Sequence, residues 1–178
     1  LITVATARLV VWLAAWQANL IISAGGWVLV HQDMYQRVLK PALDLLAQPL
    51  FEGVDSRAEE AYLRLQLGRI LKNMDRRQEE GQTHLATSLR LYREVGNLSG
   101  MSDVLYEISF YHYGGFTYNE AMAEQAQTLL QESLFLLKTL DDTRRLNLLY
   151  LRLAGIARDW GSLADATELL ENAYATAQ

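Results

Sequence analysis

The segment Ser88–Asn97, SLRLYREVGN, has two counterparts in this chain of 178 residues: SLFLLKTLDD at Ser133–Asp142 and ALDLLAQPLF at Ala42–Phe51. Each begins with a small residue, continues as Leu-x-Leu followed by Leu or Tyr, and then enters a turn. The three small residues lie 46 and 45 positions apart. Recurrence at a nearly constant interval indicates a structural repeat, so the segment predicts one supersecondary unit that is used several times.

Helices are predicted throughout the chain. It has 2 prolines and 11 glycines, and no stretch alternates apolar and polar residues with period two, so no sheet is expected. Pro41 should kink its helix or start a fresh turn, because its ring removes a backbone N–H group. The predicted helices span residues 6–23, 33–47, 56–72, 75–94, 99–113, 117–139, 142–161 and 162–178.

The helices are expected to pair into hairpins. Small residues fall at one matched point in the first helices and at another in the second helices, where they would let two backbones cross closely. Because one hairpin cannot bury its apolar face alone, successive hairpins should stack into a single domain over residues 1–178. The predicted hairpins cover about 1–50, 55–97, 99–141 and 142–178. The matched residues are Ala18, Gly68, Ser109 and Ala154 in the first helices and Ala42, Ser88, Ser133 and Ala173 in the second.

The last hairpin resembles the tetratricopeptide repeat (TPR) family. Leu153 and Ala154 supply a large residue followed by a small one, and Ala166 follows Ala154 by twelve residues, after a turn at 159–165. Ala173 comes seven residues later. The resemblance implies an all-α fold, a right-handed α-α superhelix of about four antiparallel helical hairpins. The intervals of 40 to 46 residues depart from the family's repeat of about 34.

A narrower resemblance rests on the length of the repeats, on the loop Val95–Gly100 and on the segment Leu13–Gln17. These resemble the C-terminal helical arrays of bacterial STAND-type signalling ATPases and transcriptional regulators. That resemblance implies a non-catalytic, cytoplasmic sensor or scaffold domain that binds a protein or peptide. The chain begins at Leu1 and ends in a helical pattern at Gln178, so we expect a piece of a larger protein. It contains no phosphate-binding loop GxxxxGK[ST], which places any ATPase outside this piece.

Charge and composition argue against several kinds of site. The formal net charge of −5 disfavours direct binding of nucleic acid. The chain has no cysteine, and His31, His84 and His112 have no histidine partner at i+4, so no metal site or cofactor is predicted. No catalytic residues are predicted, because no nucleophile or acid–base pair can be argued from spacing. An enzyme is therefore the least supported class.

The segment Leu9–Val30 has no charged residue over 22 positions, a length that could span a bilayer. Gln17, Asn19 and the pair Gly25-Gly26 interrupt its apolar character. We therefore expect a buried helix of a soluble protein and no membrane contact. The alternative left open is a membrane-associated helical subunit anchored through residues 9–30.

The TPR resemblance also implies a groove lined by the first helix of each hairpin. Its mixture of cations, amides and aromatics could hold an extended peptide that has an acidic side chain or a free carboxylate. Three alternatives stay open: the cations pair with nearby acids such as Glu59, Asp103 and Asp159, the aromatics pack in the core, or another face binds. A peptide-pheromone-type receptor module is a further possibility of the same class, and the oligomeric state is left open. The implied groove residues are Asn19, Tyr62, Arg69, Lys72, Asn73, Tyr106, Phe110, Tyr113 and Arg158.

Overall fold

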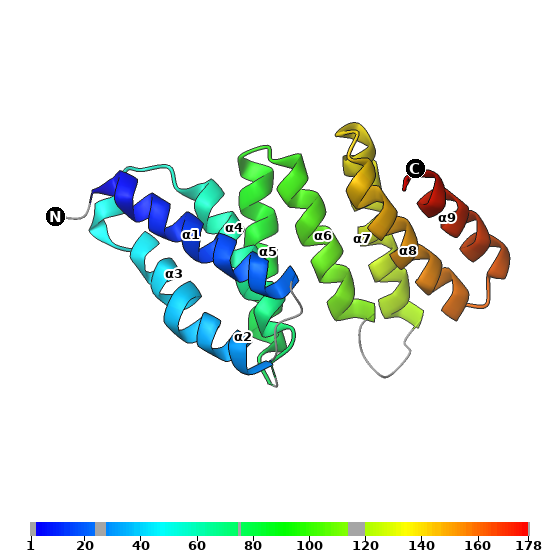
Figure 1. Ribbon diagram of the computed structural model, residues 1–178, viewed down its shortest axis with the longest axis horizontal. Helices are drawn as coiled ribbons and strands as arrows, with labels where there is room; N and C mark the ends of the chain where they lie inside the picture. Colours follow the sequence, from blue (N-terminus) through cyan, green and yellow to red (C-terminus); the bar gives the residue numbers. More distant parts are fainter. Residues whose placement is uncertain (1–2, 24–27, 75, 114–119, 178) are drawn as a thin grey trace. The chain divides into compact units, whose positions relative to one another are not determined.

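The computed structural model describes residues 3–23, 28–74, 76–113 and 120–177 (Figure 1). All secondary structure in these ranges is helical, which confirms the all-α prediction. The chain forms two compact units, Leu1–Gly96 and Asn97–Gln178. The first unit contains α1 (Val4–Ser23), α2 (Val28–Met34), α3 (Lys40–Leu46), α4 (Arg57–Leu71) and α5 (Gln78–Glu94). The second contains α6 (Leu98–Tyr113), α7 (Glu120–Thr139), α8 (Thr143–Asp159) and α9 (Leu163–Ala175).

Helices that follow one another in the chain pack as antiparallel pairs. A π-helical turn at Tyr35–Leu39 joins α2 to α3, so the described residues form eight helices. In the first unit α1 packs on this joined helix and α4 packs on α5. In the second, α6 packs on α7 and α8 on α9 (Figure 1). The pairs coincide with the predicted hairpins, whereas the grouping of all four into a single domain stays a prediction.

The π-helical turn has a local cause in Pro41. Lys40 donates its backbone N–H to the carbonyl of Tyr35, five residues earlier, and Pro41 then lies in the first turn of α3. In the first turn of a helix a missing N–H group costs little, because that group has no partner inside the helix. Pro41 was predicted to kink its helix or to start a fresh turn, and the structure shows a local change to π-helical bonding within one continuous helix.

Two helices approach closely at Gly68, one of the matched small residues. A β-carbon placed on Gly68 of α4 would lie 2.4 Å from Cγ of Leu85 in α5 and 3.2 Å from the carbonyl oxygen of Gly81. The equivalent Ala18, Ser109 and Ala154 are buried in their own hairpins. Small side chains at this point thus set how closely the two helices of a hairpin approach.

Serines at the second matched point also bind the partner helix. Ser88 of α5 donates its hydroxyl to the carbonyl of Ala61 in α4 at 2.7 Å. Ser133 of α7 lies 2.8 Å from the hydroxyl of Ser102 in α6 and donates to the Ser102 carbonyl at 3.1 Å. Both serines are fully buried, so these bonds satisfy groups that would otherwise destabilise the interior.

The prediction of a buried helix over Leu9–Val30 holds for one face only. Ala7, Val11, Ala14, Ala15 and Ala18 of α1 are buried, but the opposite face is apolar and exposed. Among the described residues, α1 is the one helix long and apolar enough to cross a membrane, and 28% of its most apolar window is buried. Residues 24–27 lie outside the described part.

Two glycine substitutions test the helix crossing. Gly68→Ala should lower the free energy of unfolding by roughly 1–2 kcal/mol, because the added methyl group meets Leu85 and this clash outweighs the gain in helix propensity. Gly155→Ala in α8 is the matched control, since its β-carbon would meet no atom within 4 Å. It should raise the same free energy by about 0.5–1 kcal/mol. Urea denaturation measures both, and equal effects would contradict the proposed crossing.

Candidate functional site

In the first unit, three pairs of side chains join α1 to α4. Nε of Arg8 donates to Oε1 of Glu59 at 2.6 Å. The rings of Trp12 and Tyr62 lie 5.0 Å apart between centroids. Further along, Nη1 of Arg69 donates to Oδ1 of Asn19 at 2.9 Å. The structure therefore brings together three of the predicted groove residues, Asn19, Tyr62 and Arg69, on one side of two neighbouring helices.

The remaining two predicted residues of this unit follow at the end of α4. Lys72 is half-buried at the C-cap, and Asn73 is exposed in the turn that follows. A lysine at the C-terminal end of a helix complements the helix dipole, which gives Lys72 a structural role as well. Arg8 and Trp12 also belong to this surface and were not predicted, although both stand at helical spacing before Asn19.

Part of the surface between α1 and α4 is polar and buried. Glu59 is 2% exposed, and its Oε2 has no hydrogen-bond partner among the described residues. Gln66, two turns further along α4, is fully buried, and neither end of its amide has a partner in the same part of the chain. Buried polar groups without partners destabilise a fold. The surface between α1 and α4 therefore contains polar atoms that make no hydrogen bond with the described residues.

The second unit has a related arrangement on α6 and α8. Tyr106 and Phe110 stack edge to face with centroids 5.1 Å apart, as their i, i+4 spacing predicts. The guanidinium of Arg152 in α8 lies 4.0 Å from the centre of the Phe110 ring. Tyr106 also packs against the core of this unit, so one aromatic serves both packing and surface. The side chain of Tyr113 lies outside the described residues.

Three acids were named as possible partners of the groove cations. One of them pairs with a groove cation, and the other two pair with different cations. Arg158 is exposed and forms a salt bridge of 2.7 Å with the adjacent Asp159, as the solvated-face alternative expects. The other two acids take cations that the prediction did not include. Glu59 pairs with Arg8, and Asp103 accepts from Nη1 of Arg145 at 2.9 Å.

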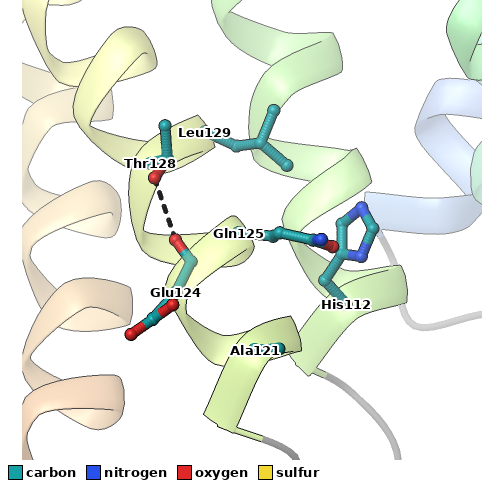
Figure 2. A pocket seen from close by; sticks show the side chains of 6 residues that line it. All are labelled: His112, Ala121, Glu124, Gln125, Thr128 and Leu129. Carbon is teal, nitrogen blue, oxygen red and sulfur yellow. Dashed lines mark hydrogen bonds between the residues drawn. The ribbon is translucent and has the colours of Figure 1, made fainter.

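A shallow hollow lies between the end of α6 and the start of α7. Figure 2 shows His112 facing Gln125 across it, with Thr128 donating to the carbonyl oxygen of Glu124 at 2.9 Å. Nδ1 of His112 finds no partner in the described structure. The polar groups do not converge on a common point, and the described residues contain no group of three His, Asp or Glu that could hold a metal ion.

His84 of α5 is largely buried beside a permanent cation. Nη1 of Arg64 donates to its Nδ1 at 3.1 Å. Burial, and then the positive charge of Arg64, lower the pKa of His84 from 6.5 to about 4. The imidazole is therefore neutral at pH 7 and serves as a hydrogen-bond acceptor for Arg64.

No protein-family model matches the chain, and no curated protein matches its sequence. The established result is an all-helical protein whose eight described helices pack as sequential antiparallel pairs.

The buried His84 predicts a dependence of stability on pH. The unfolded chain binds a proton at this residue below pH 6.5, whereas the folded chain does so only below about 4. Stability should therefore fall as the pH drops through this window. In the wild type this protonation should lower the free energy of unfolding by roughly 3 kcal/mol between pH 7 and pH 4, and His84→Gln should remove that decrease. Urea denaturation between pH 7 and pH 4 measures it, and parallel pH profiles for variant and wild type would contradict it.

Proposed function

We propose that the chain is a protein- or peptide-binding module of the TPR type and a non-catalytic arm of a larger, cytoplasmic, bacterial signalling or regulatory protein. In this proposal the hairpins stack in a right-handed superhelix. Support comes from sequential helix pairs that cross at small residues, the architecture that the TPR resemblance implies. Binding of a ligand would bias the conformation of a neighbouring domain.

One observation carries this proposal: the first helices of successive hairpins contact each other through their side chains in both units. In the first unit α1 and α4 share the pairs that include Trp12–Tyr62 and Asn19–Arg69. In the second unit, α8 reaches α6 through the Arg145–Asp103 bond and the stacking of Arg152 on Phe110. Side-by-side first helices form the surface that lines the groove in TPR proteins.

The first unit offers the more distinct binding chemistry. The bond to Asn19 orients the guanidinium of Arg69, a planar group whose N–H donors match the geometry of a carboxylate. Lys72 lies one turn further along and adds positive charge. Tyr62 and Trp12 supply a ring surface nearby. The ligand that fits this set is an extended peptide with an apolar side chain and either an acidic residue or a free C-terminal carboxylate.

A membrane-associated subunit draws on the same α1 helix. However, α1 is bound to α4 by the Arg8–Glu59 and Asn19–Arg69 pairs, and a spanning α1 would have to break both. It would also leave the nearly buried Glu59 without its cation. These contacts favour the binding module. A peptide-pheromone-type receptor would use the same surface and differs only in its ligand.

The binding proposal is tested with a random peptide library that has free C-termini. Enriched peptides should carry an acidic residue or use the terminal carboxylate. Arg69→Ala should then weaken binding of the selected peptide by roughly 1.5–3 kcal/mol, the range for a hydrogen bond to a charged group. Added salt should weaken wild-type binding as well. Isothermal titration calorimetry measures both effects.

The matched control is Arg90→Ala, which removes an exposed cation of α5 that pairs with Glu94 away from α1. Its affinity should equal that of the wild type. Thermal unfolding of each variant separates a binding defect from a folding defect, because Arg69 also contacts Asn19. Unchanged affinity of a stably folded Arg69→Ala variant at low salt would place the binding site elsewhere.

A further inference from the structure

The second unit has a groove between its two second helices, α7 and α9. α8 packs on both of them and contributes the floor (Figure 1). We call this space the α7–α9 groove. Its volume of 290 Å³ lies just below the range of about 300–1,000 Å³ that is typical of small-molecule pockets. The space therefore suits one side chain of a partner better than it suits a cofactor.

The α7–α9 groove lies between two neighbouring hairpins. Its walls are their facing sides, and all of its lining residues fall between positions 127 and 169. On α9 the lining residues are those on the side of the preceding hairpin. In a stack of hairpins each unit contacts only its neighbours, so a further hairpin would pack on the opposite side of α9 and leave the groove open.

The floor of the groove is apolar. Leu153 and Ala157 of α8 are buried, and Leu134, Trp160 and Leu169 are half-buried against the same core. Nε1 of Trp160 is buried and has no partner among the described residues, so the accessible part of the indole is ring carbon. Leucine side chains and an aromatic ring can cover the methylene groups of a long side chain.

The walls of the groove are polar and acidic. Asp165 and Glu168 of α9 are both exposed and lie one turn apart. The hydroxyl of Ser162 donates to Oδ2 of Asp165 at 2.5 Å, which orients that carboxylate. Gln127 and Gln131 stand on α7, and each amide offers a carbonyl oxygen as a further acceptor. Of the described residues that line the groove, none is basic.

The helix dipole explains only one of these two acids. Asp165 lies in the first turn of α9, where a negative charge is favourable. Glu168 lies in the second turn, and α9 contains no lysine, arginine or histidine that could pair with it. Its neighbours at i−3 and i+3 are Asp165 and Glu171, and like charges one turn apart destabilise a helix. The α9 wall therefore carries negative charge that the stability of α9 does not require.

An arginine side chain fits this combination of surfaces. A planar guanidinium stacks on an aromatic ring and forms paired hydrogen bonds with a carboxylate, while its methylene groups are apolar. The same unit contains one such stack, since the guanidinium of Arg152 lies 4.0 Å from the centre of the Phe110 ring. A lysine ammonium is a strongly hydrated point charge, so it would gain less from the ring and from the planar carboxylates.

We propose that the α7–α9 groove binds an arginine side chain of a partner protein. Trp160 and the leucines of the floor cover its methylene groups, and Asp165 and Glu168 neutralise its charge. Binding also relieves the repulsion between the two carboxylates. The α7–α9 groove shares no residue with the surface described under the proposed function and selects a ligand of opposite charge. Each proposal can therefore fail without the other.

The probe for this site is the blocked tripeptide acetyl-Gly-Arg-Gly-amide, titrated into the isotope-labelled full chain and followed by NMR. The indole N–H signal of Trp160, identified by its loss in Trp160→Phe, should shift saturably with a roughly millimolar dissociation constant. The matched citrulline peptide has nearly the same shape without the charge, and it should cause no shift at equal concentration. The matched lysine peptide should bind more weakly than the arginine peptide.

Single-charge variants separate the groove from the rest of α9. Glu168→Gln should weaken binding of the arginine peptide about two- to fivefold, the range for one exposed ion pair. Glu171→Gln is the matched control, because it removes the same charge from an exposed position of the same helix that does not line the groove. Its affinity should equal that of the wild type. Added salt should weaken wild-type binding as well.

A second variant acts from the opposite wall. Gln131→Lys places a cation of the chain itself in the groove, so it should compete with the arginine peptide and reduce its binding further than Glu168→Gln does. Both substituted residues are exposed, so both variants should stay folded, which circular dichroism checks. Glu168→Gln should not lower the unfolding temperature, because it also removes repulsion within α9.

Several results would overturn the proposal. One is the absence of a saturable shift of the Trp160 signal with the arginine peptide. Equal responses to the arginine and citrulline peptides would show that charge plays no part. Equal weakening by Glu168→Gln and Glu171→Gln would show a general attraction to the acidic surface of α9. Shifts caused by spermidine and not by the arginine peptide would assign the groove to a small polyamine instead.

Discussion

The absence of a side chain at Gly68 is the constraint on which the first unit depends. Leu85 of α5 occupies the space that a β-carbon on Gly68 would fill, so α4 and α5 are held close together. That close approach also brings Ser88 within bonding distance of the Ala61 carbonyl. A tight hairpin presents a well-defined surface to its neighbour, and the pairs between α1 and α4 require such a surface. Packing at one small residue therefore fixes contacts several turns away.

Most of the helical architecture was predictable because it depends on local signals and on the repeat. The matched small residues identified the hairpins, since their spacing records where two helices must cross. Helix ends were less predictable. The helix expected from residue 75 begins at Gln78, because Arg76 adopts a left-handed conformation with φ of 61°. This conformation was not predicted, because the residue at this position is neither glycine nor asparagine, the residues that usually adopt it. The helix expected from residue 33 begins at Val28, within an apolar run that has no capping residue.

The sequence proposes the residues of the candidate site one by one, but it does not give the contacts among them. Asn19 and Arg69 are both proposed from the groove positions that the TPR resemblance implies, but the bond between them depends on how α1 lies on α4, fifty residues away. The exposure of α1 was missed for a related reason. An uncharged run such as Leu9–Val30 shows that its side chains favour an apolar environment. It does not show whether another helix is present to bury them.

The unequal burial of α1 and α4 has a consequence for motion. Nine of the fifteen residues of α4 are buried, against five of the twenty residues of α1. Helices with few buried contacts open at low free energy, whereas those covered on several sides open only when the whole unit unfolds. Backbone amides of α4 should then exchange hydrogen with solvent far more slowly than those of α1. The first unit thus has a slowly exchanging centre in α4 and an edge at α1 that detaches and reforms on its own.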